Sequence, residues 1–324
     1  MPIRPMRTVL VALIALVASV LVGAAPATPA TAKPAHKTWD VWVGSESKNL
    51  AIQGMRFLPG SITINAGDNV AWMANSAEIH TVTFFKGGHP RKKLPEFDPN
   101  KKRQITQVGG HVYDTSKYFN SGIITTIRSG GDAGPLPPVP HYQKYKLRFP
   151  RAGTFTYYCL VHGTMMVGKI KVQPKGSKYP FTQAQYTAQA QSEARALLAQ
   201  GRQLRRETVD KAGPRRVMAG NDDNAVMLMR FVNRTVRVKV GQSVTWVSPG
   251  MLAPHTVTFG KEPPPPGLFG PSGNPRNFTG GALNSGIIPP GGKFRVTFKK
   301  AGTYRYVCAL HDPLGMVGRV IVER

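Results

Sequence analysis

The stretch AGTFTYYCLVH at positions 152–162 recurs as AGTYRYVCALH at positions 301–311. In both copies a Gly turn leads into residues of high β propensity, and the run closes on a Cys with a His three positions later. Three other blocks precede this one in each half of the chain, in the same order. They are 55–57 with 229–231, 80–84 with 255–259, and 120–124 with 284–288. Four ordered matches indicate one module present twice.

Each module has the pattern of a β domain. Polar and apolar residues alternate at 61–65 and 235–239, and both runs lead to a Gly turn. The segments 146–149, 154–158 and 168–172 follow the same pattern. Many short strands between Gly and Pro turns favour a Greek-key sandwich or barrel. We therefore expect an all-β fold of two tandem Greek-key β-sandwich domains, with Trp72 and Trp246 in core or sheet packing.

The two copies differ in length between the blocks. The first carries extra residues at 86–118 and 128–145, and insertions of that size are expected on loops at the ends of the sheets. Between the copies, 182–210 is rich in Ala, Gln, Arg and Leu and lacks Pro, which predicts a connecting helix with a break near Gly201. Its arginines, Arg202, Arg205 and Arg206, are expected on a solvated face.

The first 25 residues have the pattern of an export signal. Arg4 and Arg7 precede an apolar run at 9–22, and small residues follow at 23–25. The run is about 14 residues long, where a membrane-spanning helix needs about 20. No second apolar stretch approaches that length. We therefore expect the mature protein to have no transmembrane segment. We expect it to be periplasmic or extracellular, either associated with the cell surface or not.

These patterns divide the 324 residues into five parts. A signal peptide at 1–25 is followed by a disordered linker of mostly Pro, Ala, Thr and Lys at 26–37. The remaining parts are a first domain with loop insertions at 38–174, a helical linker at 175–213 and a second domain at 214–324. A chain of this length suits two domains better than one, and 41% hydrophobic residues are enough to fill their cores.

Each module contains the same four side chains of metal-ligand type. A His in mid-module is followed by a Cys at a strand end, a His three residues later and a Met shortly after. The sets are His80, Cys159, His162 and Met166 in the first module and His255, Cys308, His311 and Met316 in the second. A thiolate, two imidazoles and a thioether suit copper, and a trigonal His, His, Cys plane with a long axial Met is the blue-copper arrangement. The sequence therefore predicts two mononuclear type 1 copper sites.

These residues resemble the cupredoxin family of plastocyanin/azurin-like proteins, in particular its plastocyanin and amicyanin branch, over nearly all of both modules. The second loop, 308–316, is similar to the plastocyanin loop, with two residues between Cys and His and four between His and Met, and Pro254 precedes His255. The first loop departs from it, since three residues separate His162 from Met166. Met166 is preferred to Met165 as axial ligand because Met-Val-Gly recurs at 316–318. The resemblance implies electron transfer with redox partner proteins.

Other functions remain open at this stage. Cys159 and Cys308 could form a disulfide, but that would leave both His–Met loops unexplained. An enzyme related to multicopper oxidases or nitrite reductases would need a further copper centre, with His-X-His pairs and a His directly after the Cys, and the chain has neither. The remaining candidates for a further metal are His89, His111 and His141, which are more simply surface histidines of the insertions. Copper storage or delivery is the third alternative.

The charge balance indicates the kind of partner. The chain has 43 Lys and Arg against 16 Asp and Glu, a net charge of +27. Seven of the basic residues lie at 86–103 in the first insertion, opposed within that range by Glu96 and Asp98. They are Lys86, Arg91, Lys92, Lys93, Lys101, Lys102 and Arg103. Such a patch could steer encounters with an acidic redox protein or an anionic cell surface, or merely keep a loop solvated. Nucleic acid is excluded as a partner because an exported chain with no recognition motif does not meet it.

Overall fold

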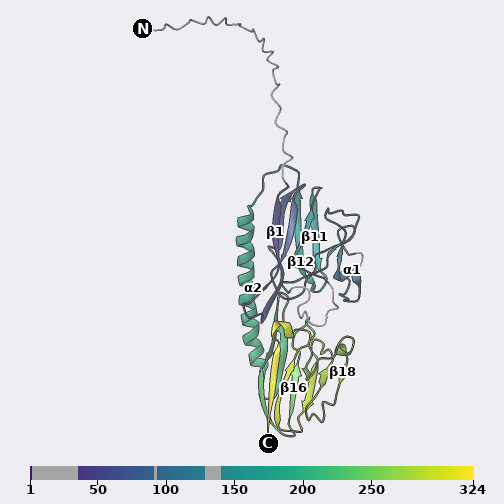
Figure 1. The fold of residues 1–324 in the computed structure, drawn as a ribbon, viewed down its shortest axis with the longest axis vertical. Coiled ribbons are helices and arrows are strands. Elements are labelled where there is room, and N and C mark those ends of the chain that lie inside the picture. The colour runs from purple at the N-terminus through teal and green to yellow at the C-terminus, as the bar shows by residue number, and fades with distance from the viewer. Residues whose placement is uncertain (2–35, 91–92, 128–139) are drawn as a thin grey trace. The chain divides into compact units, whose positions relative to one another are not determined.

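The computed structural model describes Met1 and residues 36–90, 93–127 and 140–324 (Figure 1). The predicted export signal and nearly all of the predicted linker lie outside the described residues. So do 128–139 of the second insertion and Arg91 and Lys92 of the basic patch.

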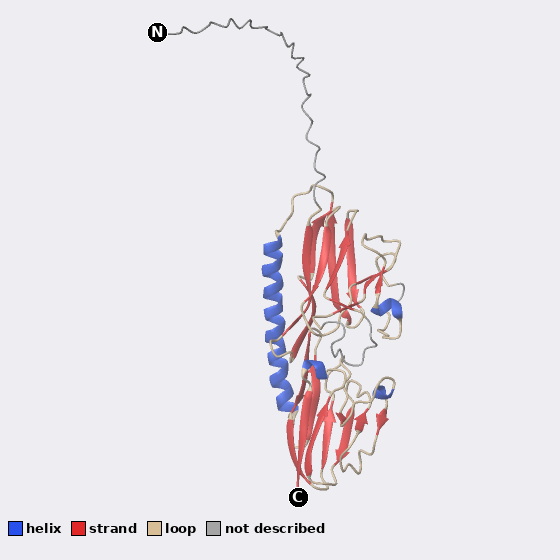
Figure 2. Cartoon of the chain, in the orientation of Figure 1, coloured by secondary structure: helices blue, strands red, loops and turns tan. Residues whose placement is uncertain are grey.

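Strands are the main regular structure of the described chain, and one long helix lies between two β regions (Figure 2). The first β region consists of β1 (Thr38–Glu46), β2 (Ile52–Leu58), β3 (Ser61–Asn65), β4 (Asn69–Ala74), β5 (Thr83–Phe84), α1 (Lys102–Ile105), β6 (Gln107–Val108), β7 (Phe119–Ser121), β8 (Ile123–Ile124), β9 (His141–Tyr142), β10 (Lys144–Arg148), β11 (Gly153–Cys159) and β12 (Gly163–Gln173). The helix α2 (Gln183–Lys211) follows. The second consists of β13 (Arg216–Asp222), β14 (Val226–Val232), β15 (Thr235–Lys239), β16 (Ser243–Val247), β17 (Thr258–Phe259), η1 (Gly267–Phe269), β18 (Pro271–Ser272), β19 (Leu283–Ser285), β20 (Lys293–Thr297), β21 (Gly302–Val307), η2 (Asp312–Leu314) and β22 (Val317–Glu323).

The all-β fold class is confirmed, and the two modules have matching sheets. One six-stranded sheet has the order β3-β12-β11-β5-β7-β6, and the other has the order β15-β22-β21-β17-β19-β18, which joins equivalent strands of the second module. The strands predicted at 61–65 and 235–239 have those bounds in the structure. Each module also has its own aromatic core, in which Trp72 and Trp246 are fully buried, as expected.

The remaining large sheet runs through both modules, which the sequence did not predict. Its order is β10-β4-β1-β2-β14-β13-β16-β20, so equivalent strands stand on either side of the central β2–β14 pair. These two strands are antiparallel, with Gln53 opposite Met227. The amide of Met55 donates to Ala225 and the amide of Met229 donates to Ala51, both at 2.8 Å. Pairing the two edges covers polar backbone that each module would otherwise expose, and residues 36–324 form one compact unit.

The helix α2 packs on this sheet against strands of both modules. Thr182 caps its N-terminus, and Thr182 and Gln185 form a reciprocal capping box. The predicted break near Gly201 is wrong, because the helix is continuous. A methyl group at Gly201 would overlap the side chain of Ile52, so this glycine permits close packing on β2. Arg202 and its neighbouring arginines are exposed, as expected.

Candidate metal centres

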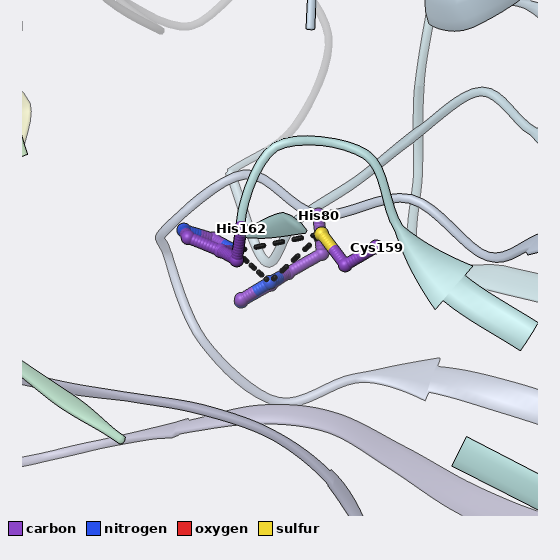
Figure 3. Close-up of side chains that lie close together, drawn as sticks. All are labelled: His80, Cys159 and His162. Carbon is purple, nitrogen blue, oxygen red and sulfur yellow. Dashed lines mark hydrogen bonds between the residues drawn. The ribbon is translucent and has the colours of Figure 1, made fainter. Parts of the chain in front are cut away.

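Three of the predicted ligands converge in the first module (Figure 3). His80 precedes β5, Cys159 is the last residue of β11, and His162 lies in the tight loop before β12. The Nδ1 atoms of the two imidazoles are 3.1 Å apart, and Cys159 Sγ lies 3.4 Å from Nδ1 of His162 and 3.9 Å from Nδ1 of His80. All three side chains are buried. Two ring nitrogens and one sulfur thus face a common point.

The second module repeats this geometry. Cys308 Sγ lies 3.4 Å from Nδ1 of His311 and 3.8 Å from Nδ1 of His255. Within the described residues, these two trios are the only groups of three or more His, Cys, Asp or Glu side chains whose ligand atoms come this close together. Both cysteines are buried free thiols, so the disulfide alternative is wrong.

A threonine in each module orients the Cys, and the sequence alone did not assign it this role. The backbone amide of Thr81 donates to Cys159 Sγ at 3.4 Å, and its Oγ1 accepts a hydrogen bond from the amide of Leu160 at 2.8 Å. Thr256 makes the same two bonds, to Cys308 Sγ at 3.3 Å and from the amide of Ala309 at 2.8 Å. The only signal in the sequence was that this threonine follows the His in both repeats.

A glycine in each module makes room for the first His. Gly44 interrupts the pairing of β1 with β2, and Gly220 interrupts that of β13 with β14; both have positive φ. A methyl group at Gly44 would lie 2.6 Å from Nε2 of His80, and one at Gly220 would overlap Nε2 of His255. Ser76 Oγ lies 2.8 Å from Nε2 of His80, the ring nitrogen that does not face the trio, and so fixes the orientation of that ring. These bulges are invisible to a periodicity search because they occur inside strands.

Burial sets the protonation of the ligands. It lowers the pKa of His162 to about 3, with the charge of His311 contributing, and it lowers the pKa of His311 to about 4. The pKa values of His80 and His255 fall well below the ordinary value for the same reason, so all four imidazoles are neutral and have lone pairs free to bind a metal.

Burial acts in the opposite direction on the thiols. It raises the pKa of Cys159 and of Cys308 to about 11, although several hydrogen bonds to each sulfur oppose the change. A thiolate in this position therefore requires a cation beside it. Neutral imidazoles grouped with a thiol that ionises only next to a cation are the donor set expected of a soft metal site, so the residues fit copper.

The methionines separate into two environments. Met166 is fully buried in the same core cluster as Cys159, and Met316 is fully buried in the same cluster as Cys308. Cys308 also donates its amide to the carbonyl oxygen of Met316 at 3.0 Å. Met165, the alternative axial ligand, packs instead into a separate apolar cluster.

The other histidines lie apart from these trios. His141 is in β9 and half-buried, His89 lies in the loop after β5, and His111 is exposed. None of the three belongs to a group of converging ligands within the described residues. None of the described helices is long and apolar enough to cross a membrane.

Comparison with known proteins agrees with this geometry. Residues 216–323 match the family model of copper binding proteins of the plastocyanin/azurin family. The chain is 33% identical over 107 residues to the chloroplast plastocyanin of Tetradesmus obliquus, covering 33% of this chain and 66% of that protein. It is 31% identical over 107 residues to the plastocyanin of Scenedesmus fuscus, covering 33% of this chain and 97% of the relative. The solved structure of a mutant amicyanin in its Cu(I) form matches with 28% identity and a TM-score of 0.24, over 33% of this chain and 80% of the other. The chain thus spans slightly less than two thirds of the first of these relatives.

Proposed function

Because this chain belongs to the plastocyanin/azurin family of copper-binding proteins, we propose that it is an exported electron-transfer protein with one mononuclear type 1 copper in each module. The observation that carries the proposal is the pair of buried His, Cys, His trios with matching geometry. One such trio could arise as a structural accident, but two with the same backbone support point to one chemistry used twice.

The proposed ligand sets are His80, Cys159, His162 and Met166, and His255, Cys308, His311 and Met316. A copper ion bound there would supply one-electron exchange between Cu(I) and Cu(II). The chain holds the donors in place beforehand. Thr81 and Thr256 orient the sulfurs, and the glycine bulges seat the first imidazoles. A rigid donor set of this kind reduces the movement that accompanies a change of charge.

Exchange with partner proteins is proposed to occur at the second His of each trio. His162 is 5% exposed and His311 is 9% exposed, whereas His80 and His255 are each 1% exposed. We assign no catalytic residue, because every residue of both trios is accounted for as a copper ligand and the relatives named are plastocyanins. The basic residues of the first insertion would steer an acidic redox protein or an anionic cell surface toward the chain.

Export and domain organisation complete the proposal. The signal at 1–25 would be removed, and the mature chain would act in the periplasm or outside the cell. The proposed domains are 38–174 and 214–324, joined by the helical linker 175–213. The helix observed within this linker packs on both modules, which supports its role as a connection.

The test is the visible spectrum of the mature protein loaded with Cu(II), with copper counted per chain. We expect two coppers and an intense blue thiolate-to-copper band that falls by about half in Cys159→Ala and in Cys308→Ala. A colourless protein would refute the proposal. More than two copper ions per chain, remaining after loosely bound metal is removed, would favour an enzyme with a further copper centre.

A further inference from the structure

The two metal loops each contribute a side chain, Met165 and Leu314, to one apolar cluster. Met55 of β2 and Met229 of β14 are fully buried in it. Around them pack residues that adjoin the metal loops of both modules. They are Leu50, Ala77, Ile127 and Met165 from the first module and Met227, Leu252, Ala253 and Leu314 from the second. Side chains of both metal loops therefore pack in the same cluster. If one loop moves, it displaces side chains against which the other loop packs.

An arginine of the second module links its metal loop to the first module. Arg230 follows Met229 and is half-buried. Its Nη1 donates to the carbonyl oxygen of Leu314 at 2.6 Å, inside the loop between His311 and Met316. Its Nη2 donates to the carbonyl oxygen of Asn49, in the turn between β1 and β2. One guanidinium thus joins the second metal loop to a turn of the first module.

That turn leads to the first centre. It begins at Glu46, the last residue of β1, whose Oε2 accepts the amide of Ala77 at 2.7 Å. Ala77 lies three residues before His80, and its neighbour Ser76 contacts the His80 ring. Hydrogen bonds, together with the backbone from Glu46 to Asn49, therefore connect His80 with the loop that carries His311.

The first module has an equivalent arginine. Arg56 of β2 donates to the carbonyl oxygen of Met165, in the first metal loop. It thus holds the loop of its own module from β2, the strand that pairs with β14. In the second module, Asp222 accepts the amides of Met251 at 2.8 Å and Ala253 at 3.0 Å, two residues before His255.

We propose that Arg230 is a positioning residue that couples the two metal loops, so that metal bound in one centre orders the ligand loop of the other. The proposal rests on the proposed function, since it requires both trios to hold copper. Arg230 acts by fixing the carbonyl of Leu314 against the turn of the first module that contains Asn49. It does so with a planar fork of donors that a lysine does not possess.

The test measures backbone hydrogen exchange in the full mature chain carrying Cys308→Ala, with Cu(I) as the probe. Only the first centre retains its thiolate in this variant. Cu(I) should slow exchange at 159–166, which reports local binding, and also at 311–316, which reports transmission. Adding Arg230→Lys should preserve the local effect and abolish the transmitted one. Arg237→Lys is the matched control, because Arg237 is an exposed arginine of β15 paired with Glu323, and it should preserve both effects.

Each other result has a distinct meaning. Two results overturn the coupling but leave the assignment of the metal sites intact. One is that Cu(I) does not slow exchange at 311–316 in the Cys308→Ala chain. The other is that it still slows exchange there after Arg230→Lys is added. No local slowing at 159–166 overturns the assignment of the first centre, and the coupling falls with it. Should Arg230→Lys fail to fold by circular dichroism, Glu46→Ala in the Cys308→Ala chain decides, because it removes the acceptor of the Ala77 amide from the same series. It should abolish the effect of Cu(I) on exchange at 311–316 and preserve the effect at 159–166, and a transmitted effect that persists overturns the coupling.

Discussion

The glycine bulge behind His255 provides the sharpest test of how the second centre is built. In Gly220→Ala the new methyl group would overlap Nε2 of His255 and lie 2.6 Å from its Cε1. The matched control is Gly241→Ala. Both glycines have positive φ, +67° and +88°, but a methyl group at Gly241 would meet no atom within 4 Å. The two variants therefore share the backbone cost and differ in the clash with the ligand.

The magnitudes follow from these contacts. An alanine held in the left-handed region costs about 1–2 kcal/mol relative to glycine, which is the full effect expected for Gly241→Ala. An extra methyl group in a packed site adds about 1–3 kcal/mol, so Gly220→Ala should cost about 2–5 kcal/mol. If the His255 ring moves aside, the clash is relieved in the metal-free protein and appears as weaker metal binding instead, at about tenfold for each 1.4 kcal/mol.

Two measurements capture both forms of the cost. Urea unfolding of the metal-free protein measures stability, and Cu(II) titration in a Cys159→Ala background measures the affinity of the second centre. The loss of stability and the loss of Cu(II) binding free energy, added together, should be larger in Gly220→Ala than in Gly241→Ala. Equal stability and equal affinity in the two variants would refute the role assigned to this glycine.

Three further predictions concern the axial ligand, the helix and the partner surface. Met166→Leu should shift the absorption band of the first centre in a Cys308→Ala chain, whereas Met165→Leu should leave it unchanged; the opposite pattern would make Met165 the ligand. In Gly201→Ala, overlap with Ile52 should cost about 1–3 kcal/mol, and the better helix propensity of alanine should offset about 1 kcal/mol of it. The free energy of unfolding in urea should therefore fall by about 0–2 kcal/mol; a stabilised variant would contradict the packing. The rate of electron exchange with an acidic redox protein should fall as salt increases, because salt screens the basic insertion; a constant rate would exclude steering.

Much of the fold and both trios could be predicted from the sequence. A residue pattern that is ambiguous in one module becomes informative when the same pattern recurs in the other. The block His-Thr-Val-Thr-Phe and the block ending in Cys-X-X-His occur in both halves in the same order, which identifies residues that act together despite long separations. Alternation at 61–65 and 235–239 was enough to place strands, since one face of each is buried. These signals depend only on repetition within the chain and on local periodicity.

The support around the trios could not be predicted in this way. Gly44 and Gly220 occupy bulges, whose effect depends on which side chain lies behind the strand. Arg56 and Arg230 belong to a repeated block, but their carbonyl partners are remote in sequence. An isolated glycine lowers helix propensity and so predicts a helix break at Gly201, whereas contact with Ile52 overrides that preference. Each of these cases turns on a tertiary contact between distant residues.

The pairing of β2 with β14 explains why two modules with separate cores behave as one unit. An edge strand offers unpaired amides and carbonyls, and two equivalent edges are self-complementary when they run antiparallel about a local two-fold relation. The bonds from Met55 to Ala225 and from Met229 to Ala51 have this reciprocity. The same relation places Arg56 and Arg230 on the two paired strands, so each metal loop is anchored at a boundary where the modules share backbone hydrogen bonds. Joining the sheets thus also determines how each ligand loop is held.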